Sequence, residues 1–358
     1  MKKAKAILAL ALTLMLAFSF AACGKASTEE TESTEVITLT AGHADSTESI
    51  FQFGLEAFKT KLEELSGGTM TVNIYPSGQL GTLKETLDQV RMGTCDIAPI
   101  GYSVLASYAS DMGVLDLPFL WDSYEHVNNA FAGELGSYFA SELANSGLEV
   151  VGWFSQGFRE VTSKPKIETL ADMQNLKIRV MSSDVYTQTF TALGCAPMSV
   201  DFSELFAALQ QGTVDGQENP MAILLAVQIE QYHKHLTLWN YLIDPLVLYW
   251  NKREWERFPP DVQDAIRTAA NEATRYEKAL VRAGLDDGQS QRLLEETFHT
   301  AAPVPDPVAT LEARGVTVTR LTAAEIEAFR AATAAVTEKW IPRIGTAVVE
   351  AARADMQP

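Results

Sequence analysis

The 358-residue sequence is poor in the residue types from which catalytic and metal sites are built, with three cysteines and five histidines. His233 and His235 stand two positions apart in a segment predicted to be helical, a spacing that directs them to different sides. Neither a Ser-His-Asp nor a Cys-His arrangement has local motif support, and no Gly-rich phosphate loop is present. We therefore expect a protein that is not an enzyme and has no catalytic residue, metal ion or cofactor.

Positive charge is also scarce, since 28 lysines and arginines face 46 acidic residues and give a net charge of −18. Nucleic acids and anionic membrane surfaces both need a cationic protein face, so the composition argues against either as a partner. A buried arginine in such a chain is conspicuous, because it must attract an anionic ligand locally against the field of the whole protein.

Long apolar runs are missing except near the N-terminus. Three lysines precede an apolar run over residues 6–20, which is shorter than the ~20 residues of a membrane span but typical of a signal peptide. Two alanines then precede Cys23, as at the site where bacterial lipoproteins are lipidated and cut. We predict a signal peptide over 1–22, a lipid on Cys23 and a flexible tether over 23–35. Ordinary cleavage that leaves a free thiol is the alternative.

Cleavage before Cys23 would leave 336 residues, with 25 basic and 46 acidic side chains and a net charge of −21. This length exceeds what one hydrophobic core usually holds, so two domains are expected. Cys95 falls in a predicted strand and Cys195 in a turn. We expect both to be buried free thiols, with a disulfide as the alternative.

Strand and helix patterns alternate along the chain, which is typical of an α/β sheet with mainly parallel strands. Strands are predicted at 36–41, 69–75 and 95–100, a helix capped by Ser46 or Thr47 follows the first strand, and another helix covers 82–92.

Beyond Pro259 the chain is predicted to be mainly helical. Two prolines open a long helix that runs to Gly284, and its pattern resumes beyond Gly288. A last strand covers 316–321, and helices extend over 323–354.

Residues 175–220 contain the clearest candidate for a binding site. The order is strand, helix, strand, helix and turn, with Arg179 on the first strand and Asn219 in the last turn. Because side chains alternate along a strand, Arg179 lies opposite its apolar neighbours. A fixed guanidinium and a fixed amide suit holding a carboxylate rather than breaking a bond.

These motifs resemble those of the solute-binding proteins of tripartite ATP-independent periplasmic (TRAP) transporters. The matching motifs are YPSGQLG (75–81), GFREVTSKP (157–165), LKIRV (176–180), LGCAP (193–197) and FSELFAALQQGTVDGQENP (202–220). The resemblance implies a protein outside the cytoplasm, tethered to the cell membrane by its lipid, that captures a small organic acid. It would deliver the acid, as a monomer, to a TRAP permease driven by an ion gradient.

The resemblance also implies two discontinuous α/β domains of the periplasmic-binding-protein type, joined by hinge strands and a long spanning helix. One domain would comprise 36–156 and 245–284, and the other 157–244 and 285–358. The ligand would lie between them near the carboxyl ends of strands, and the hinge would close around it.

Three residues are the leading ligand contacts implied by the resemblance. Arg179 would make a two-pronged contact with the ligand carboxylate, although a solvated strand face is the alternative for an isolated arginine. Arg159 would be a second arginine near the ligand, with a structural salt bridge as its alternative. Asn219 would donate its amide to the same carboxylate, with capping of a helix after Pro220 as its alternative.

Further candidates are weaker, and two of them, Phe202 and Trp153, are either pocket walls or core. The full set of these weaker candidates is Phe202, Trp153, Asn240, Tyr241, Asp244, Tyr102, His43 and Thr82. Gly101 and Val104 stand where the sialic-acid-binding branch carries an acid and an arginine, which argues against a sialate.

The aromatic candidates, together with Trp239, predict an aromatic cleft with few charges from the first domain. The expected ligand is a monocarboxylate or sugar acid of modest size, or a small dicarboxylate whose second acid meets Arg159. Two other functions stay open from the sequence: a binding protein of an ATP-driven importer, and an exported carboxylate-processing enzyme.

Overall fold

The computed structural model describes residues 36–105 and 110–354 of the chain. The predicted signal peptide, Cys23 and the tether lie outside the described residues. Within these two ranges, no helix has both the length and the apolar character needed to cross a membrane.

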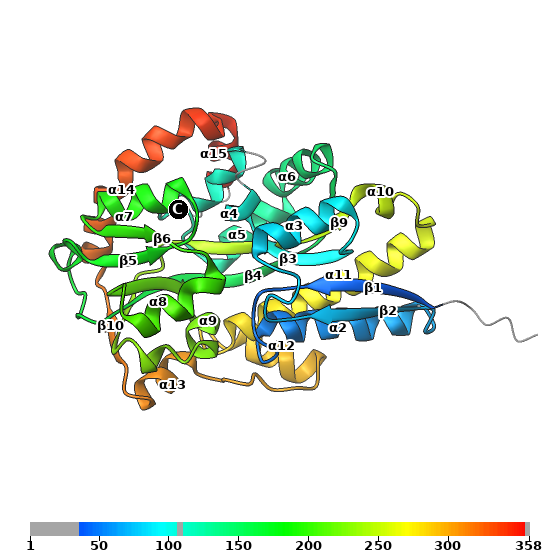
Figure 1. Cartoon of the computed structure of the whole chain (residues 1–358), viewed down its shortest axis with the longest axis horizontal. Helices are drawn as coiled ribbons and strands as arrows, with labels where there is room; N and C mark the ends of the chain where they lie inside the picture. The colour runs from blue at the N-terminus through cyan, green and yellow to red at the C-terminus, as the bar shows by residue number, and fades with distance from the viewer. Residues whose placement is uncertain (1–35, 106–109, 355–358) are drawn as a thin grey trace, which may run out of the picture. The chain divides into compact units, whose positions relative to one another are not determined.

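Two groups of short parallel strands form the ends of one large sheet (Figure 1). In the first group, β1 (Ile37–Gly42) lies between β2 (Met70–Tyr75) and β3 (Ile97–Gly101). In the second group, β5 (Lys177–Val180) lies between β6 (Ala196–Ser199) and β7 (Gly216–Pro220). A further parallel pair joins β8 (His235–Leu238) to β10 (Thr317–Arg320).

Two longer antiparallel strands connect these groups. The strand β9 (Ile243–Asn251) pairs with β3 on one side and with β4 (Leu148–Ser163) on the other. The register of β4 against β9 shifts between Ser155 and Phe158, and from Arg159 onward β4 pairs with β7 instead. One strand therefore crosses from the first group to the second at the position of Arg159.

The helices cover both faces of the sheet (Figure 1). Their bounds are α2 (Ile50–Leu65), α3 (Leu83–Met92), α4 (Tyr102–Leu105), α5 (Tyr124–Ala132), α6 (Glu134–Asn145), α7 (Asp184–Ala192), α8 (Leu205–Gln211), α9 (Met221–Ala226), α10 (Lys252–Trp255), α11 (Pro260–Arg282), α12 (Gln289–Thr297), α13 (Pro307–Ala313), α14 (Ala323–Ile344) and α15 (Thr346–Arg353). Short 3₁₀ turns occur at η1 (Ser110–Asp116), η2 (Leu170–Met173), η3 (Phe202–Glu204) and η4 (Ile229–Gln231).

The alternation of side chains along the strands separates the main cores. In β9, Val247 and Tyr249 pack in one cluster with α3, α5, α6, α14 and α15, whereas Leu248 and Trp250 pack in another with α2 and α11. A third cluster lies against the second strand group and contains Ile178, Trp239 and Tyr241. Period-two alternation is what a sheet with helices on both faces requires.

The predicted α/β fold class is confirmed, as are the helices on either side of Gly288. The predicted strands appear within a residue or two of their expected bounds. Cys95 and Cys195 are buried free thiols in separate clusters, as expected. The exact domain boundaries remain a prediction.

Several local expectations are corrected. The strand pairing is parallel within the two groups, as expected, but both connecting strands run antiparallel to their neighbours. Ser49 caps α2, in place of Ser46 or Thr47. GQENP forms strand β7 rather than a turn. His233 and His235 do not share a helix, since β8 begins at His235.

Gly284, which follows α11, offers a test of the packing between this helix and the proline-rich connection. Its φ is +75°, and an added Cβ would lie 2.1 Å from the carbonyl oxygen of Pro305. Gly315 has a similar φ of +86° but no atom within 4 Å of such a Cβ. We expect Gly315→Ala to lower the free energy of unfolding by about 1 kcal/mol, because alanine is strained in the left-handed conformation. Gly284→Ala should cost ~1–3 kcal/mol more through the clash. Urea denaturation measures both, and equal losses of unfolding free energy in the two variants would contradict this account.

Candidate ligand-binding site

A small inner cavity of about 30 Å³ lies where β4, β7 and β9 meet the end of β3. It is lined by Asp45, Leu83, Pro99, Gly101, Gln156, Arg159, Met181, Phe202, Asn219, Ile223 and Leu246. Its volume has room for a group of a few atoms rather than for a whole ligand.

An outer pocket of about 530 Å³ shares Asp45, Leu83 and Phe202 with the inner cavity. Its other lining residues are Ala44, Ser46, Ser77, Gly78, Gly81, Thr82, Glu85, Asp201, Ser203, Phe206, Ala226 and Val227. The size is within the ~300–1,000 Å³ typical of small-molecule sites. The two spaces therefore form adjacent compartments, one narrow and one roomy.

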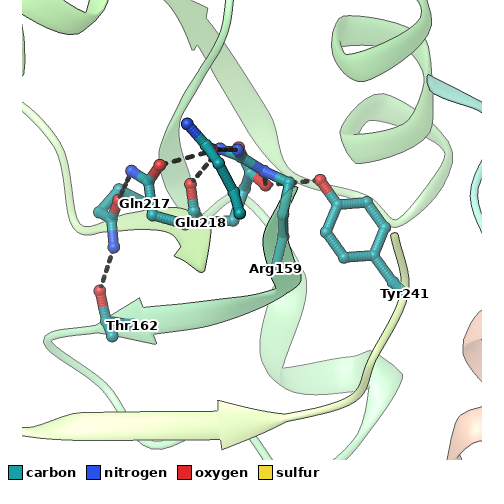
Figure 2. A network of polar contacts seen from close by, with 7 residues as sticks. Arg159, Thr162, Gln217, Glu218 and Tyr241 are labelled. Atoms are coloured by element: carbon teal, nitrogen blue, oxygen red, sulfur yellow. Dashed lines mark hydrogen bonds and ion pairs between the residues drawn. The ribbon is translucent and has the colours of Figure 1, made fainter. Parts of the chain in front are cut away.

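Arg159 is fully buried and lines the inner cavity. Its Nε and one terminal nitrogen donate to the two carboxylate oxygens of Glu218, which is also fully buried (Figure 2). The Tyr241 hydroxyl donates to the same carboxylate over 2.6 Å. A bidentate pair of this kind fixes the plane of the guanidinium. The structural salt bridge considered for Arg159 is thus present, and Arg159 still faces the cavity.

Asn219 is held in place by the same arginine. Its side-chain oxygen accepts a hydrogen bond from Arg159 over 3.0 Å, and its amide donates to the side-chain oxygen of Gln217. The alternative role for Asn219, capping a helix, is not observed, because α9 has no side-chain cap hydrogen bond. Only one hydrogen bond from this amide is found among the described residues, and an amide nitrogen carries two hydrogens. Asn219 can therefore donate to a group in the inner cavity.

The network of polar contacts continues through Gln217 to Thr162 (Figure 2). Gln217 donates to the Thr162 hydroxyl over 2.7 Å, and that hydroxyl contacts His233 Nδ1 over 3.0 Å. Burial lowers the pKa of His233 to about 4, so the imidazole is neutral and its Nδ1 can accept the hydroxyl proton. These contacts run from Tyr241 to His233 and orient each polar side chain behind Asn219.

Arg179 is the other fully buried arginine, on β5 beside Gln217 of β7. Its Nε donates to the Val200 carbonyl over 2.9 Å. Neither terminal nitrogen has a hydrogen-bond partner within residues 36–105 and 110–354. Desolvation lowers the pKa of Arg179 to about 10, Glu218 opposes this shift and Arg159 adds to it. The side chain stays cationic at neutral pH and presents two uncommitted donors. It is not among the residues that line the inner cavity, whereas Met181, two positions along, is.

The remaining predicted site residues are dispersed. Phe202 lines both compartments. Thr82 lines the outer pocket, but its hydroxyl accepts from Glu85 N and caps α3. Buried His43 contacts Gln52 over 2.9 Å. Asn240 lines a different pocket beside Glu160.

Trp153 packs against Phe131 with ring centroids 4.8 Å apart. Tyr102 is the first residue of α4, and Asp244 belongs to β9.

Two of the aromatic residues expected in the cleft do not line it. Trp239 and Tyr241 are buried together in the third core cluster, with centroids 4.5 Å apart, and leave Phe202 and Phe206 as the aromatic walls. Sequence reasoning missed Asp45, which lines both compartments. It could have been found, since Asp45 follows the carboxyl end of β1, where open α/β sheets place ligand contacts.

Comparison with known proteins agrees with this geometry. Residues 41–343 match the family of bacterial extracellular solute-binding proteins, family 7. The chain belongs to this family. The C4-dicarboxylate-binding periplasmic protein of Rhodobacter capsulatus is 30% identical over 230 residues, which cover 64% of this chain and 69% of the relative.

Two solved structures have the same fold. A TRAP periplasmic solute-binding protein from Ralstonia eutropha, with bound (S)-2-acetolactate, is 30% identical with a TM-score of 0.81 and covers 89% of this chain and 98% of its own. One from Polaromonas sp. JS666, with bound D-erythronate, is 27% identical with a TM-score of 0.80 and covers 90% and 100%. This family 7 member is thus a TRAP-type extracytoplasmic solute-binding protein, and it is not an enzyme.

The ion pair behind the inner cavity gives a stability prediction. Glu218→Gln removes the charge that compensates Arg159, and breaking one side of a buried pair typically costs ~3–5 kcal/mol. Glu204→Gln, an exposed substitution nearby, should change the free energy of unfolding by less than about 0.5 kcal/mol. Denaturant titration of the ligand-free proteins would measure both. A loss below 1 kcal/mol for Glu218→Gln would show that Arg159 does not need this partner.

Proposed function

We propose that this protein captures a small organic acid by its carboxylate, with Arg179, Asn219 and Arg159 as the binding groups, and delivers it to a TRAP permease. The observation that carries the proposal is the pair of buried Arg179 nitrogens without hydrogen-bond partners. Leaving such a charged group unpaired is costly, and a planar fork matches a carboxylate in two parallel hydrogen bonds. Movement of the two lobes would bring this fork to the ligand.

The presence of a narrow inner cavity beside a roomy outer pocket supports the same binding groups. The inner cavity is lined by Arg159 and Asn219 and suits a carboxylate, while the outer pocket has the volume for the body of an acid. The relatives bind acids of this size, namely C4-dicarboxylates, acetolactate and erythronate. The other proposed site residues fall into two groups: direct ligand contacts, such as Phe202, and residues that support the site from behind, such as Tyr241. The whole set is His43, Thr82, Phe202, Asn240, Tyr241, Asp244, Tyr102 and Trp153.

Two lobes that close on a hinge fit the course of the connecting strands. We propose domain boundaries near Gln156 and Pro245, since the register shift in β4 begins at Ser155 and β9 pairs with that part of β4. The protein would work as a monomer held to the membrane by a lipid on Cys23. The family assignment argues against the alternative of a binding protein of an ATP-driven importer, and a neighbouring gene for a permease without an ATPase would argue against it further.

Substitution of Arg179 tests the proposed function. Arg179→Ala should abolish binding of the acid, and Arg179→Lys should restore little of it, because an ammonium cannot form the two-pronged contact. Removing one member of a desolvated charge pair costs ~2–5 kcal/mol. Lys177→Ala on the same strand is the control, since its side chain is exposed. Calorimetry in which the Arg179→Lys protein binds within about threefold of wild type would exclude Arg179 as the bidentate group.

The lipid anchor has its own test. Cys23→Ala should lose lipid labelling and should be released into the soluble fraction or retained as unprocessed precursor. Membrane fractionation with mass spectrometry of the N-terminus would distinguish these states. A variant that stays on the membrane after proven signal cleavage would rule out Cys23 as the anchor.

A further inference from the structure

We infer that the Asp45 carboxylate contacts the end of the ligand distal to Arg179 and selects hydroxylated monocarboxylates over dicarboxylates. The inference rests on the proposed function, and it adds a substrate class and the residue that selects it. Asp45 occupies the boundary between the two compartments and lines both. A ligand whose carboxylate reached the inner cavity would therefore extend past this side chain into the outer pocket.

The charge around the inner cavity matches a single carboxylate. Arg159 lines the cavity and Arg179 lies close behind it on β5; both are buried, and the buried Glu218 pairs with Arg159 and also acts on Arg179. Apart from Asp45, whose carboxylate lies at the boundary with the outer pocket, these two buried cations and one buried anion leave one positive charge, which one ligand carboxylate neutralises. Among the described residues that line these two compartments, there is no further buried cation for a second ligand carboxylate.

The outer pocket has the opposite character. Its ionisable residues are Asp45, Glu85 and Asp201, and its other polar residues are serines and a threonine. Glu85 accepts from Thr82 N and Asp201 accepts from Ser203 N, so both carboxylates already serve helix caps. Within residues 36–105 and 110–354, no residue forms a hydrogen bond or ion pair with the Asp45 side chain. Its oxygens can accept from ligand hydroxyls, whereas a ligand carboxylate would be repelled.

Protonation of Asp45 should tune this selectivity. Although part of its surface is exposed, desolvation raises its pKa to about 7. The charged groups that line the same compartments are Glu85 and Asp201 in the outer pocket and Arg159 in the inner cavity. Hydrogen bonds from Thr82 lower the pKa of Glu85. Between pH 8 and pH 6 the neutral fraction of Asp45 rises about tenfold. Binding of a dianion should improve over this interval, because the repulsion disappears as Asp45 takes up its proton.

Matched acids that differ only at the distal end test the inference. D-galactonate ends in a hydroxymethyl group where galactarate carries a second carboxylate. D-erythronate and meso-tartrate form a shorter pair that differs in the same way. We expect the wild-type protein to bind the monoacid of a pair more than about tenfold tighter at pH 8. The preference should shrink by up to about tenfold at pH 6.

Asp45→Asn is the decisive variant, because it keeps the shape of the side chain and removes its charge. It should bind both members of a pair within about threefold of each other, with no change between pH 6 and pH 8. Asp264→Asn, an exposed acid on α11, controls for the loss of one charge elsewhere and should behave like wild type. Thermal unfolding would confirm that each variant is folded. If Asp45→Asn does not fold, Asp45→Glu serves in its place and should retain the preference for the monoacid.

The outcomes separate the two proposals. If Arg179→Ala abolishes binding of these acids while Asp45→Asn leaves the ratio and its pH dependence unchanged, the role of Asp45 is wrong and the proposed function stands. A wild-type preference for the diacid at pH 8 also overturns the inference. If the wild-type protein binds none of the four acids, or if Arg179→Ala binds them normally, both proposals fail.

Discussion

The buried ion pair between Arg159 and Glu218 organises the site, because it forms at the point where β4 leaves the first strand group and joins β7. Its two carboxylate oxygens are used by one guanidinium and by the Tyr241 hydroxyl, so neither side chain can rotate independently. A pair of this kind contributes little net stability by itself, since desolvation of both charges opposes their attraction. Its effect is geometric: the orientation of Asn219 depends on it through one hydrogen bond from Arg159.

The positions that the sequence predicted correctly are those with local causes. Period-two alternation marked β5, and the two prolines marked the start of α11. The importance of Arg179 came from a family motif, and its burial with uncommitted nitrogens is consistent with that motif. These features need only a few consecutive residues to be recognised.

The features that the sequence did not predict depend on contacts between distant segments. GQENP was expected to be a turn because of its proline and asparagine, yet it pairs with β4 and β5 as an interior strand. Tyr241 and Trp239 were placed in the cleft, but the fold packs them against Phe190 and Phe329 in a core. The partner of Arg159 lies 59 residues away in the sequence, and no local pattern indicates that pairing.

Under the proposed function, the unpaired nitrogens of Arg179 also give a physical reason for closure that depends on ligand. A closed cleft without ligand leaves a cation desolvated and without hydrogen bonds, whereas in an open cleft water satisfies the same donors. The ligand carboxylate removes this penalty only when the lobes close around it. The free energy of binding is thus coupled to the conformational equilibrium, because the ligand interacts differently with the two states. A neutral ligand of the same shape would lack that coupling and would leave the open state favoured.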